Sequence, residues 1–508
     1  MARRWWTLLA VCVATFMLLL DITIVNVALP VIQRDLGASL TDLQWVVDAY
    51  TLTLAALLLT AGSLADRLGR RLLFVSGLAI FTLASMLCGL ATSPLFLNLA
   101  RALQGTGGAA MFATALALIA QEFSGRERGT AIAAWGATIG AAVAIGPLVG
   151  GALTDGLGWE WIFFVNVPIG AFAIAVALAR TGESRSRDAG PPDWLGAVLF
   201  SAGLFLLVFA LLRGNAEGWS SAPITSAFVG AVVSLAAFVL VERRQRRPML
   251  DLSLFGSPAF AGVSLATFAI GAGMFSMFLF LTIYLQDILG LSPLATGLRF
   301  LPLTVVSFFV AMAGGRLGAR FPARGLLGAG LGLVCLGLVL MHGVDPHSDW
   351  TALLAGLVVA GVGIGLSNPT IAGTALGVVE PARSGMASGI NNTFRMGGVA
   401  TGIAALGAVF EHRIDSKLAE LLPDHPAGLT GAVAAGGTRA ASGLAPPGRR
   451  AQIAHAAGEA FTAGLNEVLL IGALIAVAGA VSAFALIRER DFQRARAVAA
   501  PAQAGVSE

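Results

Sequence analysis

Residues 62–71 read Gly-Ser-Leu-Ala-Asp-Arg-Leu-Gly-Arg-Arg, and this short charged segment separates two long apolar runs. The runs cover residues 45–64 and 72–91, and each has the roughly 20 residues that a helix needs to cross a bilayer. A related segment from Gly315 to Arg324 follows another apolar run much later in the chain. This repeat predicts two six-helix halves separated by two inserted helices, because one class of transporters builds a central site between such parallel repeats.

Apolar runs of this length recur along the whole chain. Of the 508 residues, 57% are hydrophobic and only 12% are charged, whereas soluble domains have roughly 25% charged residues. We therefore predict an all-α integral membrane protein with 14 transmembrane helices in a lipid bilayer. The expected spans are residues 8–29, 45–64, 72–91, 96–120, 130–153, 161–178, 194–212, 223–241, 260–285, 295–314, 325–341, 352–379, 386–410 and 465–487.

These spans divide the chain into regions. Residues 1–180 are expected to form the N-terminal six-helix bundle, residues 194–241 the two inserted linker helices, and residues 259–487 the C-terminal six-helix bundle. Within the last bundle, residues 411–464 are rich in Ala, Gly and Pro and are expected to form a mobile outer loop. Residues 488–508 are expected to form a cytoplasmic tail that begins as helix and frays.

The basic residues indicate the orientation, because cytoplasmic loops carry an excess of Arg and Lys. With the N-terminus inside, most of the 32 basic residues fall in the inner segments. The chain is therefore expected in the inner (plasma) membrane with both termini cytoplasmic. Only Lys417 is a lysine, and no basic patch for a nucleic acid is visible.

Several functional classes lack their residues in this sequence. A nucleotide-binding P-loop needs a Gly-Lys-Ser/Thr ending, but Lys417 follows Ser416 in the expected outer loop, so ATP does not drive transport within this chain. The three cysteines have no C-x-x-C spacing, which indicates neither a disulfide framework nor a metal site. We expect no cofactor and no catalytic site: a membrane enzyme would need a cluster of His, Asp or Lys at a membrane face, and a receptor would usually bring a soluble domain.

Two acids lie within the expected spans, Asp21 and Asp48. An acid at the centre of a membrane helix costs about 2.5–3.5 kcal/mol on insertion scales, so such residues usually face a cavity and usually function. The five histidines fall at outer ends or in outer loops, so a proton carrier must be a carboxylate, and we assign that role to Asp21. Asp48 follows an expected capping box from Thr41 to Gln44 and is either a solvated acid at the outer mouth or a second proton site.

Polar side chains on three spans are candidates for a central cavity. Asn26 shares a face of the first span with Thr23, and Gln104 shares a face of the fourth span with Arg101. An arginine at this depth is costly unless it pairs or extends to the headgroups, and both readings of Arg101 stay open. In the thirteenth span, Asn391, Asn392 and Arg395 form a second polar stripe for substrate contact or gating.

The fifth span is expected to pack closely and to bend. It contains Gly146, Pro147, Gly150 and Gly151. Glycines at a spacing of four allow a neighbouring helix to approach, and Pro147 removes a backbone hydrogen bond and kinks the helix.

Together these segments resemble the major facilitator superfamily, specifically its fourteen-helix drug:proton antiporter subgroup. Residues 20–30 are similar to the subgroup's first-helix signature, residues 62–71 to the superfamily's inner-loop motif, residues 97–110 to the fourth-helix motif, residues 146–151 to the antiporter motif, and residues 159–170 to the entry of the sixth helix. Three positions depart from the pattern. Asp48 stands where a small hydroxyl residue is more usual, Ala142 stands where the antiporter motif usually has glycine, and Glu160 stands where the subgroup usually has arginine.

The resemblance implies specific roles for these residues. It links Arg101 to proton transfer, where we expect Arg101 to modulate the proton affinity of Asp21, and it links the glycines and proline of residues 146–151 to export. The inner-loop residues Asp66, Arg67, Gly69 and Arg70 would act as a conformational latch. The sequence therefore predicts a monomeric, proton-coupled exporter of lipophilic small molecules such as drugs or antibiotics. An importer or symporter is the alternative within transport.

Overall fold

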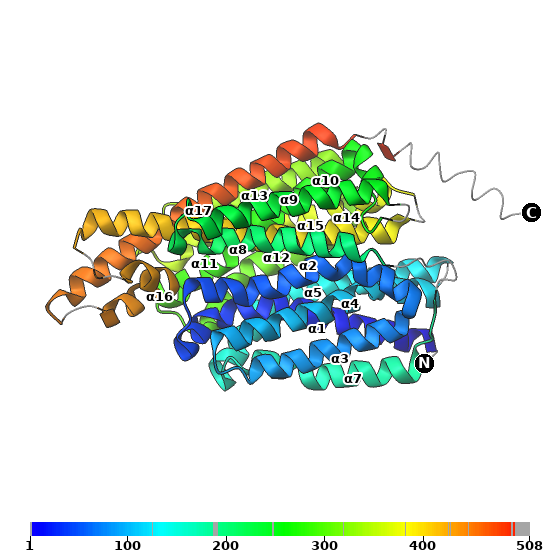
Figure 1. Cartoon of the computed structure of the whole chain (residues 1–508), viewed down its shortest axis with the longest axis horizontal. Coiled ribbons are helices and arrows are strands. Elements are labelled where there is room, and N and C mark those ends of the chain that lie inside the picture. Colours follow the sequence, from blue (N-terminus) through cyan, green and yellow to red (C-terminus); the bar gives the residue numbers. More distant parts are fainter. Residues whose placement is uncertain are drawn as a thin grey trace, which may run out of the picture.

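The computed structural model of the chain is built entirely from helices in the part that it describes (Figure 1). The described residues are 3–123, 125–185, 192–245, 248–318, 320–380, 383–424, 426, 428–444, 447–488 and 491–492. Among them, 14 helices are long and apolar enough to cross a membrane, judged by length and composition. This number confirms the prediction of 14 spans.

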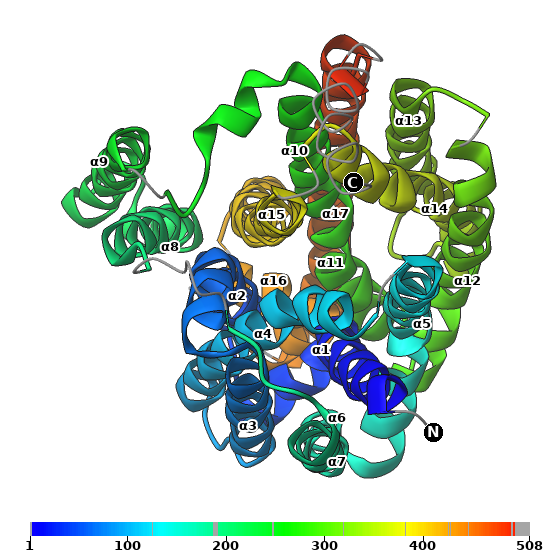
Figure 2. The same ribbon diagram turned by 90° about the vertical axis from the view of Figure 1, so that its right-hand side faces the viewer.

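The first half of the chain supplies six spans. They are α1 (Arg3–Leu36), α2 (Leu40–Leu68), α3 (Arg70–Gly89), α4 (Pro94–Glu122), α5 (Gly125–Leu157), and the short α6 (Trp161–Phe164) continued by α7 (Asn166–Arg180). Two further helices follow, α8 (Trp194–Glu217) and α9 (Ala222–Arg244). In Figure 2 this pair stands at the outside of the molecule, beside α2 and α15.

The second half supplies the other six spans. After η1 (Leu252–Gly256), one long span consists of α10 (Pro258–Ile270), η2 (Gly271–Phe275), α11 (Met277–Ile283) and η3 (Tyr284–Ile288). The others are α12 (Pro293–Gly318), α13 (Ala323–Met341), η4 (Trp350–Leu353) leading into α14 (Leu354–Gly377), α15 (Ser384–Leu421), and η6 (Pro447–Arg449) leading into α17 (Arg450–Leu486). Between α15 and α17 lies α16 (Leu429–Leu444).

Residues 411–464 are expected to form a loop, but helices cover most of the part of this segment that the structure describes. Helix α15 continues to Leu421, α17 begins at Arg450, and α16 buries Leu429 and Val433 between them. The segment is rich in alanine, the strongest helix former, and this preference outweighs its glycines. The expected tail lies almost entirely outside the described residues.

The expected cap of α2 is also wrong. Ser39, not Thr41, is the N-cap: its Oγ accepts a hydrogen bond from the Asp42 backbone N–H at 3.1 Å, and the Asp42 carboxylate accepts one from the Ser39 backbone N–H at 2.9 Å. This reciprocal box begins the helix two residues earlier than predicted. It frees Gln44, whose amide donates to the Ile403 carbonyl of α15 at 2.8 Å.

The two halves pack together most closely at the end of the molecule opposite the chain termini. We call this end the far face and the end where α1 begins and α17 ends the terminal face (Figure 1). At the far face, hydrogen bonds join the halves: Gln44 to Ile403, Gln286 Nε2 to the Val27 carbonyl at 2.7 Å, and Ser292 Oγ to the Asp155 carboxylate at 3.0 Å.

Toward the terminal face the junction of α5 and α12 opens. A Cβ added at Gly151 would lie 2.5 Å from the Pro293 carbonyl oxygen, and one at Gly297 would collide with the Pro147 carbonyl. Nearer the terminal face, a Cβ at Gly136 of α5 or Gly318 of α12 would meet no atom within 4 Å. The structure therefore holds the far face closed and the terminal face more open.

Candidate functional site

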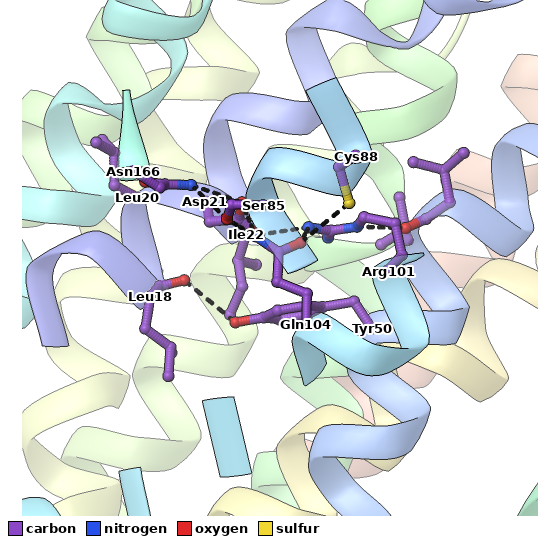
Figure 3. A network of polar contacts seen from close by, with 12 residues as sticks. Leu18, Leu20, Asp21, Ile22, Tyr50, Ser85, Cys88, Arg101, Gln104 and Asn166 are labelled. Atoms are coloured by element: carbon purple, nitrogen blue, oxygen red, sulfur yellow. Dashed lines mark hydrogen bonds and ion pairs between the residues drawn. The ribbon is translucent and has the colours of Figure 1, made fainter. Parts of the chain in front are cut away.

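The centre of the first half holds a buried carboxylate, Asp21, in the middle of α1 (Figure 3). One of its oxygens accepts a hydrogen bond from the Arg101 guanidinium of α4 at 2.5 Å. The other accepts from the Gln104 amide at 2.8 Å and from the Asn166 amide of α7 at 3.3 Å. Asp21 and Arg101 are each only 1% exposed, so the pair is shielded from water.

Arg101 is held from several sides. Its Nε donates to the Val46 carbonyl of α2 at 2.9 Å, and its Nη1 also donates to Gln104 Oε1 at 2.6 Å. The guanidinium carbon lies 4.3 Å from the ring centroid of Tyr50, a cation–π contact. Arg101 therefore pairs in the interior and does not extend to the headgroups, which decides between the two readings of its sequence position.

Three residues that the sequence analysis did not single out complete the network. Ser85 of α3 accepts a hydrogen bond from the Gln104 amide at 2.7 Å and from Asn166 at 3.3 Å, and the Tyr50 hydroxyl donates to the Leu18 carbonyl at 3.4 Å. Asn166 carried a usable signal, since it is an amide inside an apolar span. Ser85 and Tyr50 carried none, because serine and tyrosine are common in membrane helices.

Close approach of α4 to α2 brings the network together. A Cβ at Gly105 would collide with the Tyr50 carbonyl and with Thr53 Oγ1, so only glycine fits at this crossing. Bare backbone on one helix lets the next approach closely, as in other membrane helix pairs. Arg101 lies one turn before Gly105 and Gln104 lies directly before it, and both side chains reach Asp21 of α1.

This arrangement suits an ionised Asp21. Three N–H groups point at its two oxygens, and each would prefer a charged acceptor. A proton on Asp21 would displace at least one of these donors. These contacts therefore depend on the relative positions of α1, α4 and α7.

The structure places Asp48 differently from the solvated alternative. Its side chain is fully buried in α2, and neither carboxylate oxygen has a hydrogen-bond partner among the described residues. Gln44 and Ala55 of the same helix bond to Ile403 and Thr393 of α15. Because Asp48 lies one turn after Gln44, it faces the junction with α15.

The other polar candidates do not gather around Asp21. The Asn26 amide donates to the Ile22 carbonyl of its own helix at 3.0 Å. The expected stripe on α15 splits, because Asn391 bonds to Thr267 of α10 at 2.9 Å, whereas Asn392 bonds to the Ser388 carbonyl. Arg395 is half-buried, and its Nε has no hydrogen-bond partner among the described residues.

The glycines of α5 contact α1 next to Asp21. A Cβ at Gly146 would overlap Thr23 Oγ1, and one at Gly150 would lie 2.7 Å from the Ile24 carbonyl oxygen. Pro147 and Gly151 face the other way, toward α12. This short segment thus packs against α1 beside Asp21 on one side and against α12 of the second half on the other.

The charged segment between α2 and α3 is tied to the end of α7. Asp66 pairs with Arg70 at 2.8 Å, and the Arg70 backbone N–H donates to the Ser184 carbonyl at 3.0 Å. Gly69 has φ +126°, a conformation that favours glycine. Arg67 is exposed.

Comparisons with known proteins agree with this architecture. The family model described as Major Facilitator Superfamily matches residues 11–403. The chain is 38% identical to the puromycin resistance protein pur8 of Streptomyces alboniger, covering 80% of this chain and 82% of the relative. It is 34% identical to the tetracenomycin C resistance and export protein of Streptomyces glaucescens, covering 96% and 93%, and 35% identical to the multidrug efflux pump LfrA of Mycolicibacterium smegmatis, covering 94% and 95%.

Solved structures share the fold. A bacterial homologue of the human lysosomal transporter Spinster, in an inward-facing and unoccupied conformation, superposes with a TM-score of 0.66 at 19% identity, covering 97% of this chain and 98% of that chain. A peptide transporter bound to sulfate gives a TM-score of 0.62 at 15% identity, covering 94% and 95%. With its matched family model, its relatives and its two six-helix bundles, the chain belongs to the major facilitator superfamily.

Proposed function

We propose that this protein is a proton-driven exporter of lipophilic small molecules. The observation that carries the proposal is the buried Asp21–Arg101 pair, a titratable acid shared by two helices whose relative motion would make or break it. Relatives that cover almost the whole chain are named for resistance, export or multidrug efflux, which supports the direction and the substrate class.

The orientation and the assembly state belong to the same proposal. The excess of arginines near the terminal face supports a cytoplasmic location for that face, in the inner (plasma) membrane. Both bundles come from one chain, which supports a monomer. The closed far face would then be the outer gate.

The proposed cycle uses Asp21 as the coupling acid. In the conformation with a closed outer gate, Asp21 accepts three hydrogen bonds as an ionised carboxylate, which supports this conformation as the state after proton release. Substrate enters from the cytoplasmic side, and the bundles then rock to open outward. A proton from outside displaces Arg101 from Asp21, and the protonated site returns inward to release it.

The driving force is sufficient for export. A membrane potential of 100 mV supplies about 2.3 kcal/mol per proton, and one pH unit adds about 1.4 kcal/mol. One proton per neutral substrate sustains a gradient of between about two and three decades at this driving force.

The test is Asp21→Asn, with Asp35→Asn as the matched control because Asp35 is an exposed acid near the end of the same helix. A susceptibility panel across antibiotic classes in an efflux-deleted host first identifies a substrate. We expect Asp21→Asn to bind this compound in detergent but to lose its uphill, proton-dependent uptake into everted vesicles. The control should transport normally. If the Asn variant still concentrates substrate and still collapses the pH gradient, Asp21 is not the coupling acid.

A further inference from the structure

Arg395 lies in the middle of the second half, and its guanidinium forms no ion pair with any residue that the structure describes. We propose that Arg395 binds an acidic group, such as a carboxylate or an ionised phenol, on the exported molecule. This inference rests on the proposed exporter function and adds a charge preference to it.

The surroundings of Arg395 offer it no acid. Between residues 258 and 410 the acidic residues are Asp287, Asp345, Asp349 and Glu380, and each lies near an end of a span or in a connection. Helices α10, α12, α13 and α14 contain none. A charged side chain at this depth usually pairs or faces a water-filled route to a ligand.

The acids of the first half are also unsuitable partners in this conformation. Asp21 is taken by Arg101. Asp48 faces α15, but Gln44 bonds to Ile403 and Ala55 to Thr393, and this antiparallel register places Asp48 near the level of Ala400. Arg395 lies more than one helical turn closer to the terminal face.

The Arg395 side chain leaves α15 on the side that faces the space between the two halves. The α10 side of α15 carries Asn391, which bonds to Thr267, and Phe394, whose ring lies 5.8 Å from Phe255. The α2 side carries Thr393. Helix α8 covers the outside, where the Asn215 amide donates to the Ala408 carbonyl at 2.8 Å.

Arg395 lies on the remaining side, toward Asn392 and Val399, by the helical spacing. It is half-buried rather than sealed, although its Nε is inaccessible to solvent and has no partner among the described residues. Since α8 closes the lipid side, the exposed part of the guanidinium faces the space between the halves.

A guanidinium in this setting favours a planar anion. It can donate two parallel hydrogen bonds to a carboxylate, and such charge-assisted pairs are about twice as strong as neutral ones. A cationic substrate would instead meet an uncompensated positive charge. The half-buried Asn392 amide, one turn away, could donate an additional hydrogen bond.

The test compares three fluorescent probes that differ in charge: pyrenebutyrate, pyrenebutanol and a pyrenebutyl-trimethylammonium ion. Dissociation constants are measured on the purified full-length protein in detergent. We expect the wild type to bind the acid about ten-fold or more tightly than the alcohol, and the cation most weakly. Arg395→Gln should bring the ratio of acid to alcohol close to one, and Arg395→Lys should retain part of it.

Arg299→Gln is the matched control. Arg299 is also a half-buried arginine of the second half, but it lies over Trp350 at 5.2 Å and donates to the Ala295 carbonyl, so its loss should leave the acid preference unchanged. Equal binding of acid and alcohol by the wild type, or an equal loss of all three probes in Arg395→Gln, overturns the inference while the exporter proposal stands. A wild type that binds none of the probes and exports no compound of the susceptibility panel overturns the exporter proposal together with it.

Discussion

Gly146 of α5 packs directly against Thr23 of α1, two residues after Asp21. A side chain at position 146 would occupy the place of the Thr23 hydroxyl, which donates to the Leu20 carbonyl at 3.0 Å. The segment that resembles an antiporter motif therefore sets the distance between α5 and the helix that carries Asp21, the proposed coupling acid. Movement of α5 during transport would act on Asp21 through this contact.

We predict that Gly146→Leu abolishes export with little loss of membrane insertion, because the span stays apolar while the contact with α1 is lost. Pro147→Leu should act similarly, since Pro147 provides the kink and its carbonyl lies beneath Gly297. The control is Gly136→Leu on the same helix, where an added Cβ meets no atom within 4 Å. Substrate efflux and the amount of protein in the membrane are measured together. Full efflux by the variants at positions 146 and 147 would show that these residues serve only in helix packing and are not required for export.

The orientation can be tested by topology reporters. We predict that a reporter fused after Arg71 reads as cytoplasmic and that one inserted at Gly428 reads as external. Gly428 suits an insertion because it has φ +83°, and a Cβ there would meet no atom within 4 Å, whereas neighbouring α16 is helical. Reporters on the same side of the membrane would contradict the odd number of spans expected between these positions.

Much of the fold could be predicted from the sequence, for a physical reason. A spanning helix must satisfy its own backbone hydrogen bonds and needs about 20 apolar residues, so hydropathy alone marks it. Outside the bilayer this constraint disappears, and the helices between Glu411 and Gly464 were missed. The π-helical turns η2 and η3 were missed as well, since their sequences give no local sign of the i→i+5 hydrogen bonds that define such turns.

Asp48 gives a prediction about stability. Its carboxylate is buried at the junction of α2 and α15 without a partner among the described residues, and such a group costs about 1–3 kcal/mol. We expect Asp48→Thr to raise the thermal unfolding temperature in detergent by a few degrees, because the hydroxyl can donate to the Gln44 carbonyl one turn earlier. The control is Thr51→Ala, which removes a hydroxyl already bonded to Val47. An Asp48→Thr protein that melts earlier than the wild type would show that the acid has a stabilising partner.

The partners within the site could be predicted only in part. The sequence identifies Asp21, Arg101 and Gln104 as polar side chains within membrane spans, where burial of a polar group costs free energy. The structure brings them into contact. The same reasoning identifies Asn26, but its amide donates a hydrogen bond within its own helix. An asparagine side chain can donate to the backbone carbonyl four residues earlier and then needs no partner on another helix. Spacing along one helix shows which side chains share a face, but not which neighbouring helix that face meets.

A pH-dependent contribution to stability is expected at Asp251, which lies outside the spans. It caps η1 through the Ser253 backbone N–H at 2.9 Å and pairs with Arg383 at 2.9 Å. Partial burial acts to raise the pKa of Asp251, but the hydrogen bonds from Ser253 and the charge of Arg383 outweigh it and hold this pKa below its ordinary value. A lowered pKa means that the stabilisation is present at neutral pH and is lost as the pH falls through the pKa of the folded state.

Asp251→Ala should therefore lower the unfolding temperature at pH 7, by an amount that corresponds to about 1 kcal/mol for a lost cap. The difference from the wild type should begin to shrink near pH 4, where the unfolded carboxyl is about half protonated, and should approach zero only as the pH falls below the lowered pKa of the folded state. Thermal unfolding in detergent at several pH values provides the measurement, with exposed Asp35→Ala as the control. A difference that persists unchanged at low pH would assign the effect to packing instead of charge.

The last prediction concerns Asp66 in the last turn of α2, next to the junction with α3. Its carboxylate accepts from Arg70 Nη2 at 2.8 Å and Nε at 3.1 Å, and both side chains are partly exposed. The pair is local, and in this conformation with an open terminal face it does not join the two halves. An exposed pair contributes about 0–1 kcal/mol, so it is not required for folding.

We therefore expect Asp66→Asn to insert and melt like the wild type but to export about ten-fold more slowly, because the acid is needed when the terminal face closes and a partner from another helix end can replace Arg70. Glu420→Gln is the control: it removes an exposed pair with Lys417 at 3.0 Å at the far face, outside the motif. Efflux rates and unfolding temperatures are compared for the three proteins. Because orientation depends on Arg and Lys and little on acids, a transport defect in Asp66→Asn with normal topology would come from the conformational cycle. If Asp66→Asn exports at the wild-type rate, the latch role is contradicted. The segment would then serve only to orient the protein through its arginines.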